Sequence, residues 1–123
     1  MATELLLTDG VVRGVQGSIQ PLSQAVDVSA FDQADLLLTV CGVEGAVTTF
    51  TLVVLGGMAT ESEDGWWPLA TFANIVTSNP GTTYANLDKK VATGLLKFLR
   101  WKVIAVTGGT AVSFTVRGML RSN

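Results

Sequence analysis

A strict alternation of apolar and polar residues near the end of the chain is the strongest constraint on its fold. Alternate residues are apolar or small on each side of the segment 107–110: Leu99, Trp101, Val103 and Ala105 before it, and Val112, Phe114, Val116, Gly118 and Leu120 after it. The positions between them include Arg100 and Lys102 in the first half and Ser113, Thr115, Arg117 and Arg121 in the second. A period of two places one face of a strand against a core and the other face in water.

Two glycines divide this stretch into two halves. The segment Thr107-Gly108-Gly109-Thr110 offers residues that can take a positive φ, as tight turns require. We therefore expect 98–121 to form a β-hairpin that closes an antiparallel sheet. Arg100 and Lys102 are expected on the solvated face of this hairpin.

A second apolar stretch, Leu36 to Thr60, contains a single charged residue, Glu44. Glu44 lies in the middle of the stretch, and a carboxylate at the centre of a membrane-spanning helix costs about 2.5–3.5 kcal/mol on insertion scales. The stretch is also rich in threonine, valine and glycine, which favour strands over helices. We therefore expect two strands, 36–43 and 46–55, joined by a turn at Glu44-Gly45, and no membrane span.

The rest of the chain reads as further short strands separated by turn signals. Strands are expected at 4–8, 25–29 and 66–72, a turn at 78–81, and one helical turn or a short strand within 84–91. About seven or eight short strands with regular turns predict an all-β fold, an antiparallel β-sandwich of jelly-roll type. Because Pro21 marks a break, we divide the chain into an extended N-terminal arm or edge strand, 1–24, and a sandwich domain, 25–123.

The composition indicates that part of the surface is covered by other subunits. Hydrophobic residues make up 48% of the 123 residues and charged residues 15%, against about 25% in an average soluble protein. The mean hydropathy is +0.45. Low charge combined with exposed apolar area is typical of interfaces, so we expect a homo-oligomer. Leu5, Leu6 and Leu7 would be poor choices for a solvated tail, and we expect this segment to pack across a neighbouring subunit or another partner.

Several function classes are disfavoured by what the sequence lacks. The eight basic residues are scattered and the net charge is −2, which argues against nucleic-acid binding. The chain has no histidine and a single cysteine, so it lacks the commonest general base and metal ligand and any internal disulfide. No serine-nucleophile elbow, phosphate-binding loop or signal peptide is recognisable. We therefore expect no enzyme, no cofactor and no catalytic or metal-ligating residues, with Cys41 as a small buried side chain.

Two clusters remain as candidates for function. Glu61, Glu63 and Asp64 form an acidic loop, but a calcium site needs ligands spread more widely, so we interpret it as a solvated loop. The aromatic residues could instead form a sugar-stacking platform or an interface. Because neighbouring side chains of a strand point to opposite faces, at most one of the two adjacent tryptophans can be core. The complete set of candidate interface residues is Leu5, Leu6, Leu7, Trp66, Trp67 and Tyr84.

The order of these motifs resembles that of a known family. The segment 26–32 is followed by two apolar strands hinged at 43–45, the run 63–72, the segment 98–103 and the Gly108-Gly109 pair. Over about residues 26–121, this pattern is similar to small virion structural proteins of tailed bacteriophages. The resemblance implies a jelly-roll sandwich that decorates a capsid or builds another virion part, and it supplies no active-site residue.

From the resemblance and the composition together, we expect a bacteriophage virion protein that decorates and cements the capsid lattice. Its partners would be the major capsid protein or other virion subunits, and copies of itself. The segment of Leu5, Leu6 and Leu7 would then pack across a neighbouring subunit or the capsid surface. It would lie on the capsid exterior after assembly in the host cytoplasm, without nucleic-acid or membrane partners. Two alternatives are a carbohydrate-binding module that uses Trp66, Trp67 and Tyr84, and a shell subunit that assembles unaided.

Overall fold

The described part of the chain folds into antiparallel β-strands and one short helical turn. The computed structural model describes residues 2–76 and 87–122. Its elements are β1 (Ala2–Leu6), β2 (Val12–Gly14), the 3₁₀ helix η1 (Leu22–Gln24), β3 (Val26–Asp27), β4 (Gln33–Gly57), β5 (Trp67–Val76), β6 (Leu87–Thr93) and β7 (Phe98–Arg121). This confirms the predicted all-β class. No helix in this part of the chain is long and apolar enough to cross a membrane.

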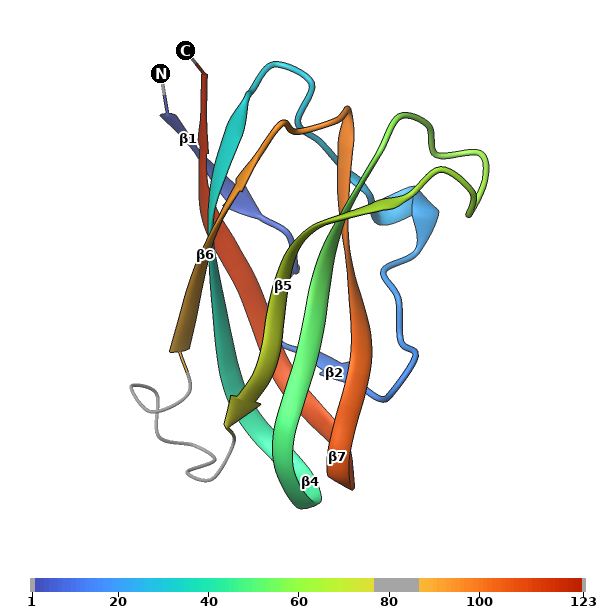
Figure 1. Cartoon of the computed structure of the whole chain (residues 1–123), viewed down its shortest axis with the longest axis vertical. Helices are drawn as coiled ribbons and strands as arrows, with labels where there is room; N and C mark the ends of the chain where they lie inside the picture. The colour runs from blue at the N-terminus through green and yellow to red at the C-terminus, as the bar shows by residue number, and fades with distance from the viewer. Residues whose placement is uncertain (1, 77–86, 123) are drawn as a thin grey trace.

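Strands β4 and β7 form one long ribbon that is folded in half. They pair antiparallel from Gln33 with Arg121 to Gly57 with Phe98, with irregular register around 40–51. In Figure 1 both strands run to the lower end of the molecule, bend there together and run back. Folding the ribbon brings its two halves face to face and encloses a core between them.

The other strands extend the two halves into two layers. In the first layer, residues 112–121 of β7 pair with β1 and β2 on one side and with residues 33–43 of β4 on the other. Residues 33–43 of β4 also pair with β6, which completes the layer. In the second layer, residues 98–107 of β7 pair with β3 on one side and with residues 49–57 of β4 on the other. Residues 49–57 of β4 also pair with β5. Two facing antiparallel layers in this strand order form a jelly-roll-like sandwich, as the sequence predicts.

The pairing within the ribbon differs from the two predicted hairpins. In a hairpin centred on Gly108-Gly109, Val106 would lie opposite Ala111. Instead, Val106 pairs with Phe50, and Ala111 pairs with Glu44. The predicted turns are therefore bends within continuous strands, and each half of β7 pairs with β4 rather than with the other half of β7.

Glycines allow the sharp bend of the ribbon. Gly45 and Gly108 have φ values of +85° and +87°, a region that residues with a Cβ rarely adopt. The two strands also approach closely here, because a Cβ added to Gly108 would lie 2.6 Å from the carbonyl oxygen of Ala46. The chain therefore reverses direction at the predicted turn positions. The predicted pairing of the two flanking segments with each other is wrong, because each segment pairs with the other long strand instead.

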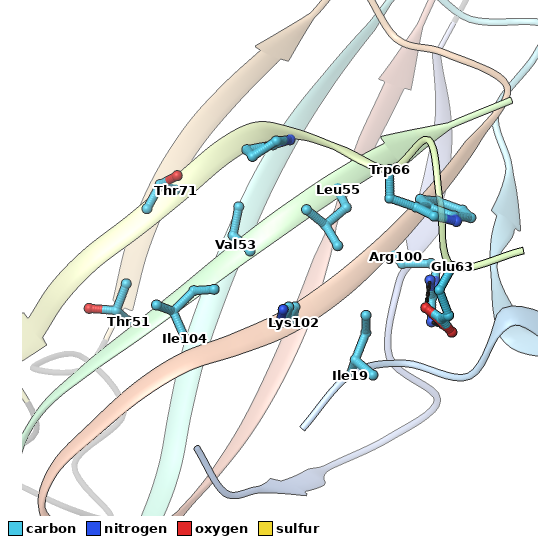
Figure 2. Close-up of a pocket in the computed structure, with 11 residues that line it drawn as sticks. Ile19, Thr51, Val53, Leu55, Glu63, Trp66, Thr71, Arg100, Lys102 and Ile104 are labelled. Atoms are coloured by element: carbon cyan, nitrogen blue, oxygen red, sulfur yellow. Dashed lines mark hydrogen bonds and ion pairs between the residues drawn. The ribbon is translucent and has the colours of Figure 1, made fainter. Parts of the chain in front are cut away.

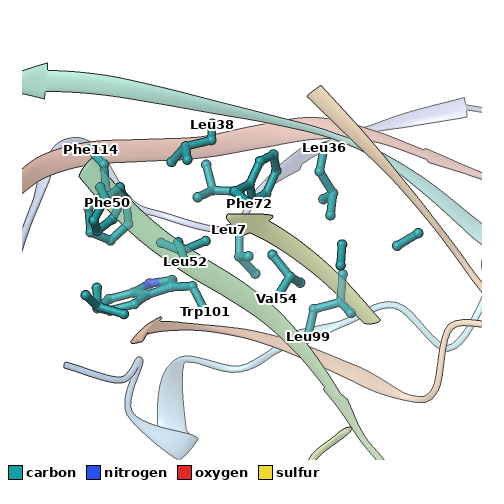
Figure 3. Close-up of a cluster of buried hydrophobic side chains, with 14 of the residues drawn as sticks. Leu7, Leu36, Leu38, Phe50, Leu52, Val54, Phe72, Leu99, Trp101 and Phe114 are labelled. Carbon is teal, nitrogen blue, oxygen red and sulfur yellow. The ribbon is translucent and has the colours of Figure 1, made fainter. Parts of the chain in front are cut away.

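The core lies between the two layers and has the predicted strand phase (Figure 3). Its members include Leu5, Leu7, Leu36, Leu38, Phe50, Leu52, Val54, Phe72, Leu99, Trp101, Val103, Phe114, Val116 and Leu120. Three aromatic rings connect the layers: Phe114 lies 5.2 Å from Trp101 in an edge-to-face contact and 5.4 Å from Phe50. Such pairs add specificity to the burial of apolar area.

The N-terminal segment is an edge strand of the sandwich. β1 pairs with the end of β7, which brings the two ends of the chain together (Figure 1). Leu5 and Leu7 are each 1% exposed within the chain's own core, whereas Leu6 points outward and is 53% exposed. The prediction that all three leucines pack on a neighbour is therefore wrong for Leu5 and Leu7. Three consecutive leucines hide the alternation that would have revealed this.

Candidate functional site

The outer face of the second layer carries a groove of about 490 Å³ (Figure 2). We call it the outer groove. It is lined by Thr51, Val53 and Leu55 of β4, Pro68 and Thr71 of β5, Arg100, Lys102 and Ile104 of β7, and by Ile19, Glu63 and Trp66 from two loops. A volume of this size lies within the range of ligand-binding clefts.

The floor of the outer groove is apolar because β4 is apolar on both faces at this point. Leu52 and Val54 point into the core, and the residues between and after them, Val53 and Leu55, point outward. Val53 and Leu55 are nevertheless almost completely buried, because neighbouring side chains cover them. In the sequence, the continuous apolar run 52–55 indicates a strand that is covered on both of its faces.

Arg100 closes one end of the groove, and its position corrects a prediction. The sequence places Arg100 on the solvated face of β7, but its side chain is 0% exposed. Its Nε donates to the carbonyl oxygen of Gln20 at 2.8 Å, and its two Nη atoms donate to the carboxylate of Glu63 at 2.9 and 3.1 Å. A buried charge requires such partners, and the two loops that supply them also remove the guanidinium from water.

Trp66 covers this ion pair. Its ring lies 4.8 Å from the guanidinium carbon of Arg100, within the range of a cation–π contact. Its indole nitrogen donates to the carbonyl oxygen of Ser62 at 3.0 Å. A Cβ added to Gly57 would lie 2.7 Å from the ring, so Gly57 is the residue that allows Trp66 to lie down on the sheet. Trp66 is therefore packed within its own chain and is not a free stacking surface.

Gln20 ties the groove to the core. Its side-chain amide nitrogen donates to the carbonyl oxygens of Leu7 and Gln24 at 2.9 and 3.0 Å, and its side-chain oxygen accepts from the backbone nitrogen of Trp101 at 3.2 Å. Gln20 is buried, so these hydrogen bonds take the place of the hydrogen bonds to water that its side chain makes in the unfolded chain. Sequence reasoning missed Gln20, because only the tertiary structure brings residues 7, 20, 24 and 101 together.

The charges in the groove leave a positive excess. The guanidinium of Arg100, through its hydrogen bonds and then its charge, lowers the pKa of the Glu63 carboxyl below its ordinary value. Lys102 also lowers it, to a smaller extent, yet forms no ion pair within the described ranges 2–76 and 87–122. Arg100 and Glu63 neutralise each other, so the groove presents an apolar floor with one ammonium group. This combination suits an apolar group that carries a negative charge.

The other predicted candidates are dispersed over the surface. Trp67 is 68% exposed and Trp66 half-buried, so the two tryptophans do not form a shared platform. Tyr84 lies outside the described residues. In the acidic loop, Glu61 and Asp64 are exposed, whereas Glu63 is held by Arg100. The described residues contain no group of acidic, cysteine or histidine side chains that could hold a metal ion.

Cys41 is exposed, contrary to the prediction that it is buried. It lies on the outward face of the first layer beside Leu37 and Thr39. The inward face of the same strand carries Leu36, Leu38 and Val40, and this face alone is covered by the core. Apolar neighbours in the sequence were thus a poor guide to the burial of a residue on the opposite face.

Large apolar side chains are exposed on the outer face of the first layer. Leu6 of β1, Met119 of β7 and Val91 of β6 all point outward there, because Leu5, Leu120 and Ala92 beside them point inward. Met119 and Val91 are the partners of Asp35 on its two sides. We call Leu6, Met119 and Val91 the first-layer patch.

No family model matches this chain, and no curated protein is similar to it in sequence.

Proposed function

We propose that this chain is a bacteriophage virion structural protein that binds the outer surface of the capsid lattice and cements it. Its partners are the major capsid protein or other virion subunits. The proposal rests on the resemblance of the motifs in 26–121 to such proteins, and the jelly-roll-like fold is compatible with it.

The observation that carries the proposal is the first-layer patch. Leu6, Met119 and Val91 are exposed on one face of a sheet, in a chain whose charged fraction is only 15%. Apolar side chains gathered on one exposed face mark a surface for a partner, and a repeated lattice offers such a partner many times. Edge strands β1 and β6 bound this face.

The test is electron microscopy of virions that carry this gene and of virions in which it is deleted. We expect density for a small β-sandwich on the capsid exterior, lost on deletion, together with a lower temperature of capsid disruption. Absence of the protein from purified virions would overturn the proposal. Density that forms the shell itself would favour a shell subunit.

Point variants test the surface. Leu6→Asp and Met119→Asp should abolish co-sedimentation of the purified protein with deleted virions. Val11→Asp is the matched control, because Val11 is similarly exposed but lies outside the first-layer patch. Retention of binding by all three variants would exclude this face. Binding that a free glycan abolishes would instead favour the carbohydrate-binding alternative.

A further inference from the structure

Residues 58–67 carry a second set of exposed groups next to the outer groove. This segment, which we call the acidic strap, projects as a green-yellow loop from the end of the second layer (Figure 1). Met58 and Trp67, at its two ends, are 63% and 68% exposed. Glu61 and Asp64 are exposed between them and form no ion pair within the described part of the chain.

The acidic strap and the outer groove are complementary in charge. The strap offers the two exposed carboxylates of Glu61 and Asp64. The groove offers an apolar floor, the exposed Ile104 and the ammonium of Lys102, whose charge no ion pair of the described residues neutralises. Opposite charges at the edge of an apolar contact favour one register over others and speed association.

The strap cannot fill the groove of its own molecule. Its residues Glu63 and Trp66 already form one end wall of that groove, where Arg100 holds them. The free carboxylates of Glu61 and Asp64 belong to the same short loop, which is fixed at this wall. The complementary surfaces therefore lie side by side on one molecule, and this is the arrangement that a two-fold axis converts into two identical contacts.

We propose that the acidic strap of one copy lies across the outer groove of a second copy, and the reverse, in a two-fold symmetric dimer. Glu61 and Asp64 of each copy face Lys102 of the other. The first-layer patch stays free on the opposite layer, so the dimer does not depend on the proposed capsid contact and can be tested without it.

Charge reversal gives a sharp test by analytical ultracentrifugation of the purified chain. Lys102→Glu should raise the dimer dissociation constant by about tenfold or more, and so should the double variant Glu61→Lys/Asp64→Lys, because each places like charges opposite one another. An equimolar mixture of the two variants should restore dimers, since both contacts of the mixed dimer then pair opposite charges. Thermal melts of each variant, in dilute solution, establish that it is folded.

Matched controls separate this interface from general surface effects. Arg117→Glu makes the same change of charge on the outer face of the first layer and should leave the dissociation constant unchanged. Ile104→Ser, in the groove, should weaken the dimer, whereas Leu6→Ser should not. A wild-type mass of 12.9 kDa at every concentration up to the millimolar range would overturn the proposal. Failure of the mixture to restore dimers would also overturn it. Loss of virion binding by Lys102→Glu, with a monomeric wild type, would assign the groove to a capsid contact instead.

Discussion

At the scale of single residues, Arg100 shows how a charged side chain becomes part of a fold. Its position in β7 points it away from the core, where a solvated arginine would be expected. Its three donor nitrogens are instead engaged by Gln20 and Glu63, and its flat face by Trp66. These contacts fasten two loops to the outer face of the second layer, so Arg100 organises the groove without being exposed in it.

The ion pair between Glu63 and Arg100 predicts a defined dependence of stability on pH. Arg100 lowers the pKa of the Glu63 carboxyl in the folded state, so the folded chain binds this proton less readily than the unfolded chain does. The pair therefore stabilises the fold above the ordinary glutamate pKa of about 4.3, and this contribution disappears as the pH falls through the lowered value. Glu63→Gln should thus be less stable than wild type at pH 7 and equally stable well below pH 4.

Urea unfolding of dilute wild type and Glu63→Gln at a series of pH values measures this difference. Glu4→Gln is the matched control, because Glu4 is exposed on β1 and forms no ion pair among the residues that the structure describes. The control should differ little from wild type at any pH. If the difference in stability between Glu63→Gln and wild type were the same at acidic pH as at pH 7, the charge of Glu63 would not act through Arg100.

At the scale of elements, β1 shows that an edge strand can be essential to a small sandwich. Among the described strands it pairs only with β7, yet Leu5 and the residue that follows the strand, Leu7, are buried in the core. Leu7 is further held by its carbonyl oxygen, which accepts from Gln20. An element at the end of the chain is thus connected by packing and by hydrogen bonds to the centre of the fold.

Two neighbouring leucines in this segment should respond very differently to truncation. Leu5→Ala should lower the free energy of unfolding by about 2–5 kcal/mol, because Leu5 is fully buried and its removal leaves a cavity. Leu6→Ala should change it by no more than about 0.5 kcal/mol, because Leu6 already faces solvent. Chemical denaturation of both variants measures the contrast. Equal effects would show that β1 is not held in the observed register.

At the scale of the whole molecule, the fold is closed by contacts between distant parts of the chain. Gln33 and Ala2 both pair with Arg121, and the folded ribbon joins β4 to β7 over its entire length. Neither half of the sandwich can form before these distant segments meet. The entropy of closing such long loops opposes folding until the apolar faces are joined.

This topology predicts slow folding for a chain of this size. We expect refolding in milliseconds to seconds, as is usual for sandwiches dominated by distant pairings, rather than in microseconds. Stopped-flow fluorescence of Trp101, in a variant with Trp66 and Trp67 replaced by phenylalanine, follows the formation of the core. Folding in microseconds would contradict the pairing of β4 with β7 and would be expected of the local hairpins that the sequence suggested.

The sequence by itself determined where the strands lie and which side chains point inward. The alternation through Leu36, Phe50 and Trp101 is a local property, because neighbouring side chains of any strand point to opposite faces. Together with the low charge, it was sufficient to predict an all-β sandwich and the glycine-rich points of reversal. Where the alternation was hidden, as in the three consecutive leucines, the prediction failed.

Only the tertiary structure decided which strands pair and what covers their outer faces. A hairpin and a bent strand bury the same alternate residues, so the alternation in β7 could not distinguish them. The burial of Arg100 and the exposure of Cys41 depend on which distant loops cross the outer faces, and no local pattern records this. The outer groove exists because Gln20, Glu63 and Arg100 meet there, brought together by packing energy from the whole core rather than by the sequence around any one of them.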